Sequence, residues 1–547
     1  MRGRRFRQPL FALLLRGPSK APETGAFLTP VGHKTAMTTI ENPPSVSREE
    51  GFAGESPAET TPDVSGTARI RSAVIWRSGS QMIGQLVMWS STFLVLRLLT
   101  PGDYGLFAMT QVVVGLAQLM NGYSFASSLV QAETLDTKRA GQVFGMLIVM
   151  NGLIAVLQFV AAPYAADYFH QPVLVAMLRV QCLLHLTTPF IIMPQALLSR
   201  AIDFRTQGRA NLLAAAAGAI TAPVCALAGL GVWTLVLAPL ALFGTRALLL
   251  AVFGRWWIRP RFDWAGASAM MGFGGTVLIS DILWFVQNQA DVFIAGRRFD
   301  AHMLGLYSEG LFLTQILVNK FVPSLNEVAF PAYARMQADR SAVAWSFAKA
   351  LSIIMLVSLP CYVGLAVVAG PLVLTVMGPK WAAAIPLVQL LAFAMPFVTL
   401  HVLYPPATNA LGRPRIGATS SAAGAVLLPI GFAIGVHYGP QGMAWAWVAV
   451  MPLLVLLSSS LSLPVIGLSW AKLGQAILPP FGAALAMGAI VYGLDRILPL
   501  MAPVLRLVTL IPVGVIAYAG FVALLARPIA LQTLAMVRGR NSKRAAA

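Results

Sequence analysis

Long apolar runs separated by short polar segments dominate the chain between about positions 74 and 526. A helix needs about 20 residues to cross roughly 30 Å of hydrocarbon, and the runs reach that length repeatedly. They are continuous rather than alternating, which favours helices over the strands of a closed barrel. The pattern predicts fourteen spanning helices, at 74–99, 105–127, 141–163, 173–198, 211–231, 232–253, 268–296, 302–328, 346–370, 382–411, 415–438, 440–466, 473–496 and 501–526.

The composition agrees with an all-α polytopic membrane protein. Hydrophobic residues make up 57% of the chain and charged residues 11%, and the mean hydropathy is +0.73, far from the balance of a soluble domain. The first 68 residues are instead rich in Pro, Ser, Thr, Gly and charge, which predicts a disordered cytoplasmic tail without a signal peptide. Met37 is a second plausible start of translation.

Lys and Arg are distributed unequally between the loops. Counted from the N-terminus, the even-numbered loops hold fourteen of them and the odd-numbered loops hold five: Arg97, Arg297, Arg298, Lys380 and Arg496. Because loops rich in Lys and Arg stay in the cytoplasm, both termini are predicted to be cytoplasmic. This distribution and the basic tails account for most of the net charge of +19, which therefore does not indicate nucleic acid.

Two segments of the chain match at an offset of 200. "TPGDYGLF" at 100–107 aligns with "DAHMLGLY" at 300–307, and Thr100 and Asp300 can each cap the helix that follows. "VQAE" at 130–133 and "MQAD" at 336–339 match at an offset of 206. Spans 1–6 and 7–12 are therefore predicted to be two copies of one unit.

Since each copy has an even number of spans, the two lie the same way up in the bilayer, and a site is expected near the midplane between them. The predicted domains are a tail at 1–68, six-helix bundles at 69–265 and 266–467, two additional helices at 468–526, and a basic cytoplasmic tail at 527–547.

Polar side chains within the spans are candidates for that site, because they are tolerated at membrane depth only against protein or a water-filled cavity. The seventh span carries Asp281 about midway along, and the eighth carries Glu309, Lys320 and Glu327 on one line of the helix. In the first half, polar residues pair at spacings of four or seven: Arg77 with Gln81, Gln111 with Gln118, and Asn151 with Gln158.

Cations occur in both halves, whereas the deep carboxyls are confined to the second. Cations in a central cavity favour an anionic substrate such as a diphosphate, and coupling to an ion gradient through a carboxylate is expected in the second half. The predicted substrate-binding residues are Arg77, Gln81, Arg179, Arg246, Asn288 and Lys320, and the predicted ion-coupling residues are Asp281, Asp291 and Glu309.

Structural interpretations of these residues remain open. Paired amides also form hydrogen bonds between helices, arginines near a membrane face can extend to water, and Asp281 and Lys320 can belong to structural ion pairs. "PKW" at 379–381 is interpreted as an interfacial anchor, with Trp381 at the headgroups and Lys380 reaching water.

The three cysteines, Cys182, Cys225 and Cys361, all fall inside predicted spans. They are expected to be small buried hydrophobes rather than disulfide partners or metal ligands, since no ligand cluster accompanies them. No catalytic residues, metal site or cofactor are predicted.

Several separated motifs resemble one transporter family. These are "LRLLTPGDYGLFAM" after the first span, "NQADVFIAG" followed by "LGLYSEG", "AFPAYARMQAD" after the eighth span and "MGPKW" after the ninth. In this order they resemble the Wzx-type polysaccharide flippases, from about 70 to 465. That family belongs to a superfamily that also contains multidrug and toxin extruders and lipid II flippases.

The resemblance implies transport of a polyprenyl-diphosphate-linked oligosaccharide across a bacterial inner membrane, through a V-shaped pair of bundles that alternates between inward-open and outward-open states. It carries over to Asp291 in the seventh-span motif, and to Arg77 and Lys320 as cations of the lumen. The expected partners are that glycolipid, H+ or Na+ as the coupling ion, membrane lipids, and a polysaccharide polymerase with its chain-length machinery.

Two other classes of protein share the size and hydropathy of this chain. A membrane glycan polymerase or ligase would carry a large outward-facing loop with catalytic Arg, His or Asp, and the odd-numbered loops here are short. A drug or small-metabolite exporter of the same superfamily would bind organic cations through acidic or aromatic groups, whereas the charges of the first half lean cationic. The sequence therefore favours a transporter of an anionic glycolipid over an enzyme or a drug exporter.

Overall fold

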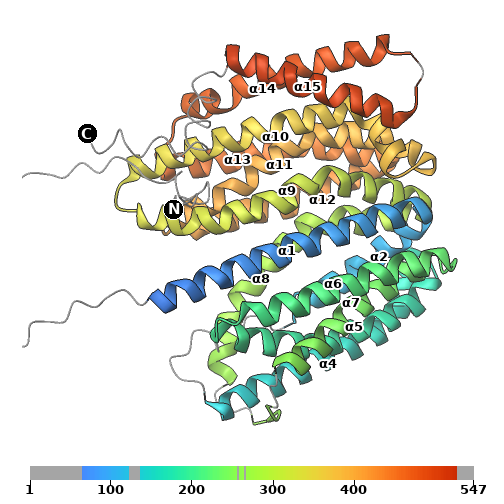
Figure 1. Ribbon diagram of the computed structural model, residues 1–547, viewed down its shortest axis with the longest axis vertical. Coiled ribbons are helices and arrows are strands. Elements are labelled where there is room, and N and C mark those ends of the chain that lie inside the picture. Colours follow the sequence, from blue (N-terminus) through green and yellow to red (C-terminus); the bar gives the residue numbers. More distant parts are fainter. Residues whose placement is uncertain (1–63, 122–135, 255–257, 264–266, 500, 526–547) are drawn as a thin grey trace, which may run out of the picture.

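The computed structural model describes residues 64–121, 136–254, 258–263, 267–499 and 501–525, which form fourteen α-helices and two short 3-10 helices (Figure 1). The first six α-helices are α1 (Val64–Leu98), α2 (Pro101–Gln118), α4 (Thr137–Phe169), α5 (Val173–Arg200), α6 (Phe204–Leu227) and α7 (Trp233–Gly254). The rest are α8 (Ala267–Arg298), α9 (Ala301–Arg335), α10 (Arg340–Val376), η1 (Pro379–Ala384), α11 (Ile385–Ala410), α12 (Pro414–Gly435), η2 (Val436–Tyr438), α13 (Gly439–Ile466), α14 (Trp470–Ile497) and α15 (Pro503–Leu525).

Each predicted apolar run corresponds to one of these α-helices. The two largest differences from the predicted boundaries are that α1 begins at Val64, inside the predicted tail, and that α2 ends at Gln118 rather than near 127. The matched segment 130–133 and the basic tail at 527–547 lie outside the described residues.

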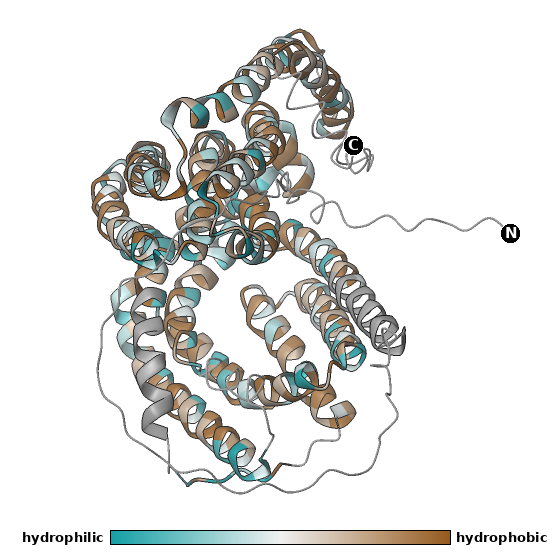
Figure 2. Cartoon of the chain, turned by 90° about the vertical axis from the view of Figure 1, so that its left-hand side faces the viewer, coloured by the Kyte–Doolittle hydropathy of each residue, from teal (hydrophilic) through white to brown (hydrophobic). Residues whose placement is uncertain are grey.

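Within the described residues, nine stretches are long and apolar enough to cross a membrane. One of them, Pro414–Ile466, contains both α12 and α13. Viewed along the helices, most of the chain is apolar (Figure 2). The helices α2, α8 and α9 are not among the nine stretches, and the apolar stretch Met82–Leu98 of α1 is shorter than these nine. The protein is thus a nearly all-helical, multi-pass membrane protein, and membrane crossing by all fourteen helices stays a prediction.

The same helix pairs pack together, in the same order, in the two halves of the chain. In the first half α1 packs on α6, α6 on α7, α7 on α5 and α5 on α4. In the second half α8 packs on α12, α12 on α13, α13 on α11 and α11 on α10. This parallel supports the interpretation of two copies, while the domain limits at 265, 266 and 467 stay predictions.

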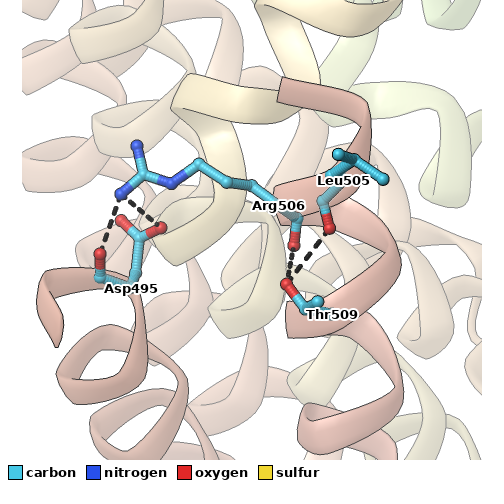
Figure 3. Close-up of polar contacts among 4 residues, drawn as sticks. All are labelled: Asp495, Leu505, Arg506 and Thr509. Carbon is cyan, nitrogen blue, oxygen red and sulfur yellow. Dashed lines mark hydrogen bonds and ion pairs between the residues drawn. The ribbon is translucent and has the colours of Figure 1, made fainter. Parts of the chain in front are cut away.

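The last two helices lie against one edge of the second half, because α14 and α15 both pack on α10. Arg506 of α15 closes the turn between them: its guanidinium lies 3.2 Å from the carboxylate of Asp495 and donates to the backbone oxygen of the same residue at 2.8 Å (Figure 3). Both side chains are largely buried, so the pair fixes how this hairpin turns.

The helices α2 and α9 begin at the caps predicted from the sequence. The Thr100 hydroxyl accepts the N–H of Asp103 at 3.3 Å, and the Asp103 carboxylate accepts the N–H of Thr100 at 2.9 Å, which is a capping box. Asp300 accepts the N–H of Met303 at 2.7 Å. The predicted roles of Thr100 and Asp300 are therefore confirmed.

The two halves meet where α2 crosses α9, and the contact is reciprocal at the offset of 200. A Cβ added at Gly105 would overlap the backbone oxygen of Ala301, and one added at Gly305 would overlap the backbone oxygen of Pro101. Adding 200 converts Pro101 and Gly105 into Ala301 and Gly305. Contacts that exchange in this way define a two-fold axis between the segments, and glycine at both positions allows the backbones to touch.

We expect Gly305→Ala to destabilise the protein by about 1–3 kcal/mol, because the obstructing atom belongs to the backbone and cannot rotate aside. Thermal unfolding in detergent measures the effect. Gly370→Ala is the matched control, since an added Cβ at this position of α10 meets no atom within 4 Å. If the two variants unfold at the same temperature, the crossing is not as close as described.

Candidate functional site

The helices α8 and α9 carry five of the nine predicted site residues. Together with α1 and α2, they lie between the two halves. Across the halves, α2 packs on α9 and on α8, α8 contacts α4, and α1 approaches α10. Each of these contacts includes α1, α2, α8 or α9, and none of these four helices is among the nine stretches.

Asp291 is buried inside the second half, with its side chain 1% exposed. The Tyr307 hydroxyl donates to the Asp291 carboxylate at 2.9 Å and accepts from Trp447 Nε1 at 2.8 Å. The other carboxylate oxygen accepts the N–H of Val292 at 2.7 Å. Asp291 therefore joins α8, α9 and α13 in this conformation, and both of its oxygens are occupied.

Glu309 is half-buried on α9, one turn after Gly305, and therefore on the face of α9 that crosses α2. It lies close enough to Tyr104 of α2 for the two groups to interact electrostatically. Within the described part of the chain, no hydrogen bond or ion pair reaches its carboxyl group. Of the three predicted ion-coupling residues, Glu309 is the one held between the halves without a partner.

Three further charged residues inside the predicted spans 268–296 and 302–328 are exposed: Asp281, Lys320 and Glu327. Among the described residues none of them forms an ion pair, so the structural pairing considered for Asp281 and Lys320 is not observed. Asn288 is half-buried and donates to the backbone oxygen of Trp284 in its own helix at 2.7 Å. That these side chains line a shared cavity stays a prediction.

The predicted cations of the first half lie in different surroundings. Arg179 is exposed on α5, and its guanidinium carbon lies 4.5 Å from the ring centroid of Phe159 on α4. Arg246 is half-buried on α7. The side chains of Arg77 and Gln81 lie outside the described part of α1. That these cations serve one site therefore stays a prediction.

Amides and a histidine connect α4, α5 and α2 inside the first half. Gln158 donates to the backbone oxygen of Leu178 at 2.8 Å and contacts His185 Nε2 at the same distance. Gln181 donates to the Thr110 hydroxyl at 3.2 Å. These residues are buried, so for Gln158 the interpretation as a hydrogen bond between helices is confirmed.

Hydrogen bonds at one end of the molecule join the halves through the ends of two helices. This α1–α2 end, where α1 ends and α2 begins, is where the halves come together at the right of Figure 1. Arg97 of α1 donates to the backbone oxygens of Thr375 and Val376, in the last turn of α10. Lys380 of η1 donates in return to the backbone oxygens of Leu98 and Leu99 at 2.9 and 3.4 Å. We term these bonds the reciprocal cap.

The interpretation of "PKW" as an interfacial anchor is wrong. Trp381 is fully buried, donates from Nε1 to the backbone oxygen of Leu96 at 3.0 Å, and stands edge-on to the ring of Tyr104 at 5.5 Å. Lys380 is bound to carbonyl groups of the other half. The segment 379–381 has the composition of an interfacial anchor. Its partners lie far away along the chain, so the local sequence does not reveal them.

The expectation for the cysteines is only partly correct. Cys182 and Cys225 are buried, whereas Cys361 is exposed on α10. An exposed position on a membrane helix suits a small, weakly polar side chain, so burial is not needed to keep cysteine there.

The sequence prediction missed a second polar network in the core of the second half. Gln287 of α8 lies 3.4 Å from His401 of α11, whose Nδ1 lies 3.0 Å from the hydroxyl of Ser458 on α13. Tyr404 and Ser459 connect α11 and α13 again, at 2.6 Å. A run of three serines, 458–460, in an otherwise apolar span was the available signal.

The described residues form a multi-pass membrane protein built from two packed halves. The chain matches the family described as "Polysaccharide biosynthesis protein" over residues 94–386, more than half of its length. The matched segment runs from the end of α1 to the start of α11 and includes the crossing of α2 and α9. The protein belongs to this polysaccharide biosynthesis family.

Curated relatives carry names from the synthesis of several surface polymers. The chain is 25% identical to the teichuronic acid biosynthesis protein TuaB of Bacillus subtilis, over 78% of this chain and 89% of that protein. It is 24% identical to the succinoglycan biosynthesis transport protein ExoT of Rhizobium meliloti, over 82% and 92%. The lipopolysaccharide biosynthesis protein WzxC of Escherichia coli is 24% identical over 54% of this chain and 60% of its own length.

Solved structures share the fold. The lipid II flippase MurJ, in an inward closed conformation, superposes with a TM-score of 0.69 at 12% identity, over 83% of this chain and 99% of that one. An inward-facing multidrug resistance transporter of the MATE family superposes with a TM-score of 0.53 at 14% identity, over 72% and 97%. At these identities the two likenesses show the fold.

We expect Tyr307→Phe to lower the free energy of unfolding by about 1–3 kcal/mol, because it removes the side-chain donor to the buried carboxyl of Asp291 and leaves Trp447 Nε1 without its acceptor. Thermal unfolding in detergent is the measurement. Tyr404→Phe removes a bond between two neutral hydroxyls and should cost less. A larger effect from Tyr404→Phe would contradict the role assigned to Asp291 as the joint of three helices.

Proposed function

We propose that this protein moves polyprenyl-diphosphate-linked oligosaccharide repeat units from the cytoplasmic to the periplasmic leaflet of a bacterial inner membrane, for the synthesis of a surface polysaccharide. The observation that carries the proposal is the position of α1, α2, α8 and α9 between the two halves, in a chain of the polysaccharide biosynthesis family. Relatives named for teichuronic acid, lipopolysaccharide and succinoglycan biosynthesis support this class of cargo.

Such a cargo has two parts with opposite solvent preferences. Its diphosphate and sugars must pass roughly 30 Å of hydrocarbon, where unpaired polar groups and charges are costly. Its polyprenyl tail is stable in that same hydrocarbon. A path between two halves, polar on its inner faces and accessible from the lipid at the side, accommodates both parts.

The cations and amides of the path are assigned to the polar head. Lys320 is exposed on α9 and has no ion-pair partner among the described residues, so its ammonium group is available to a diphosphate oxygen. Arg77, Arg179 and Arg246 are proposed to serve the same head group from the first half. The amides of Gln81 and Asn288 are proposed to bond sugar hydroxyls.

Coupling to a gradient of H+ or Na+ is assigned first to Glu309. A coupling carboxyl must change its surroundings when the halves move, and Glu309 lies at the crossing of α2 and α9 beside Tyr104. Asp281 is exposed on α8 and is kept as a second coupling group. Asp291 already has two bonded oxygens, so its part is to hold α8 against α9 and α13.

With cytoplasmic termini, the α1–α2 end faces the periplasm, and the contacts there close the path on that side. The cargo then binds from the cytoplasmic side, and rocking of one half against the other opens the α1–α2 end. Release delivers the repeat unit to the leaflet in which a polysaccharide polymerase and its chain-length machinery would use it.

Deletion of the gene is expected to abolish the surface polysaccharide while complete lipid-linked repeat units accumulate in the cytoplasmic leaflet. Extraction and mass spectrometry of the lipid-linked fraction give the structure of the intermediate, and its protection from an externally added glycosidase in intact spheroplasts gives its leaflet. Complementation with the wild-type chain is the control. Unchanged polysaccharide in the deletion strain contradicts the proposed function, and incomplete repeat units would indicate an enzyme of assembly.

Glu309→Gln is expected to lower the rate of translocation by at least about tenfold, equivalent to roughly 1.4 kcal/mol in the barrier, because the amide cannot bind and release a cation. Accumulation of the lipid-linked intermediate in the complemented deletion strain measures this, at equal protein levels in the membrane.

Glu327→Gln is the matched control, since Glu327 is exposed near the far end of the same helix and is expected to be neutral. In proteoliposomes the wild type, but not Glu309→Gln, should respond to an imposed proton or sodium gradient. Equal rates for the two variants would remove Glu309 from the coupling mechanism.

A further inference from the structure

Five cations lie in the odd-numbered loops, which are predicted to face away from the cytoplasm. Three of these five contact the opposite half of the molecule. Arg97 and Lys380 form the reciprocal cap. The guanidinium carbon of Arg297, at the end of α8, lies 4.9 Å from the ring centroid of Tyr168 on α4. Few Lys and Arg residues are expected on the periplasmic side of a membrane protein. The three at the α1–α2 end therefore need an explanation other than membrane topology.

The last turn of α1 obtains its hydrogen-bond donors from the second half. The final carbonyl groups of a helix have no partner within the helix, and cations near that end also interact favourably with the helix dipole. At the end of α1, Trp381 donates to Leu96, while Lys380 donates to Leu98 and Leu99. Separation of the halves would return all three carbonyl groups to water.

The last turn of α10 obtains its donor from the first half in the same manner. Arg97 reaches the backbone oxygens of Thr375 and Val376, which its planar guanidinium suits because it presents several N–H groups side by side. Each half therefore supplies one cationic donor to the other half, and its own backbone oxygens accept from one cation of the other half. Motion of one half away from the other stretches both sets of bonds together.

The bonds of the reciprocal cap are suited to repeated breaking. The side chains of Arg97 and Lys380 are exposed, so both cations and the carbonyl groups they leave are hydrated as soon as they part. No carboxylate is involved, so opening does not strand a buried charge. By contrast, Asp291 and Tyr307 are fully buried within one half and stay together when the halves move.

We propose that the reciprocal cap formed by Arg97 and Lys380 is the reversible latch that sets the balance between the closed and open states of the α1–α2 end. This inference rests on the proposed function in one respect only, namely that the two halves move during transport. Trp381 and Tyr104 form the buried base of the latch, and the exposed cations are its releasable part.

The latch is tested by the distance between the halves at the α1–α2 end. Spin labels are placed on cysteines at Asp167 of α4 and His302 of α9, both exposed, in a chain whose three native cysteines are replaced by alanine. Pulsed dipolar spectroscopy in lipid nanodiscs reports the closed and open populations. Arg97→Met and Lys380→Met are each expected to lower the closed-to-open ratio about tenfold, equivalent to about 1.4 kcal/mol, and the double variant should lower it further.

Arg298→Met is the matched control, because Arg298 is an exposed cation at the same end with no hydrogen bond or ion pair among the described residues. It should leave the distances as in the parent chain, and Lys380→Arg should do the same because it keeps a cationic donor. If Arg298→Met shifts the distances as much as the other two, net charge rather than capping is responsible and the latch is refuted.

Unaltered distances in Arg97→Met and Lys380→Met refute the latch as well. Should either variant fold poorly, Trp381→Phe keeps an aromatic ring at the buried position and removes the Nε1 donor together with part of the indole, and it is expected to shift the ratio in the same direction by less. All of these measurements use purified protein without cargo. Their outcome is therefore independent of the accumulation of lipid-linked intermediates, which tests the proposed function.

Discussion

The close approach of two backbones, those of α2 and α9, fixes the geometry on which the rest of the molecule depends. Gly105 and Gly305 allow the chains to touch at a single crossing, and the neighbouring elements are placed by it. Tyr104, next to Gly105, packs against Trp381, and Glu309 follows Gly305 by one turn. The structural contact between the halves and the carboxyl assigned to coupling thus share one short segment of each helix.

The two halves share a backbone arrangement but differ in chemistry. At the offset of 200 that aligns Gly105 with Gly305, Glu309 corresponds to Met109, Asp291 to Ser91 and Asp281 to Gln81. Met109 is fully buried, and Ser91 donates to a backbone oxygen of α6. The same backbone arrangement therefore packs in the first half without the carboxyl groups that the second half carries, so packing alone does not require them.

Features that depend on local sequence were predictable. Apolar run length gave the helices, and the caps at Thr100 and Asp300 follow from residues three positions apart. The periodicity of Glu309, Lys320 and Glu327 gave a helix face but not its environment, since Glu309 is half-buried and the other two are exposed. Trp381 was misinterpreted because its acceptor, Leu96, lies 285 positions away. The bonding of Asp291 likewise depends on Trp447, through Tyr307, at a separation that no local pattern encodes.

The two-fold contact at the crossing also bears on how such a chain could arise. Residues 101 and 105 meet residues 301 and 305 in exchange, so one six-helix unit with a small residue at each place would already fit a second copy of itself. Gene duplication followed by fusion would then join partners that associate as a symmetric dimer, without inventing a new interface. Afterwards each copy could diverge independently, so that only one of them carries acidic groups deep within its spans.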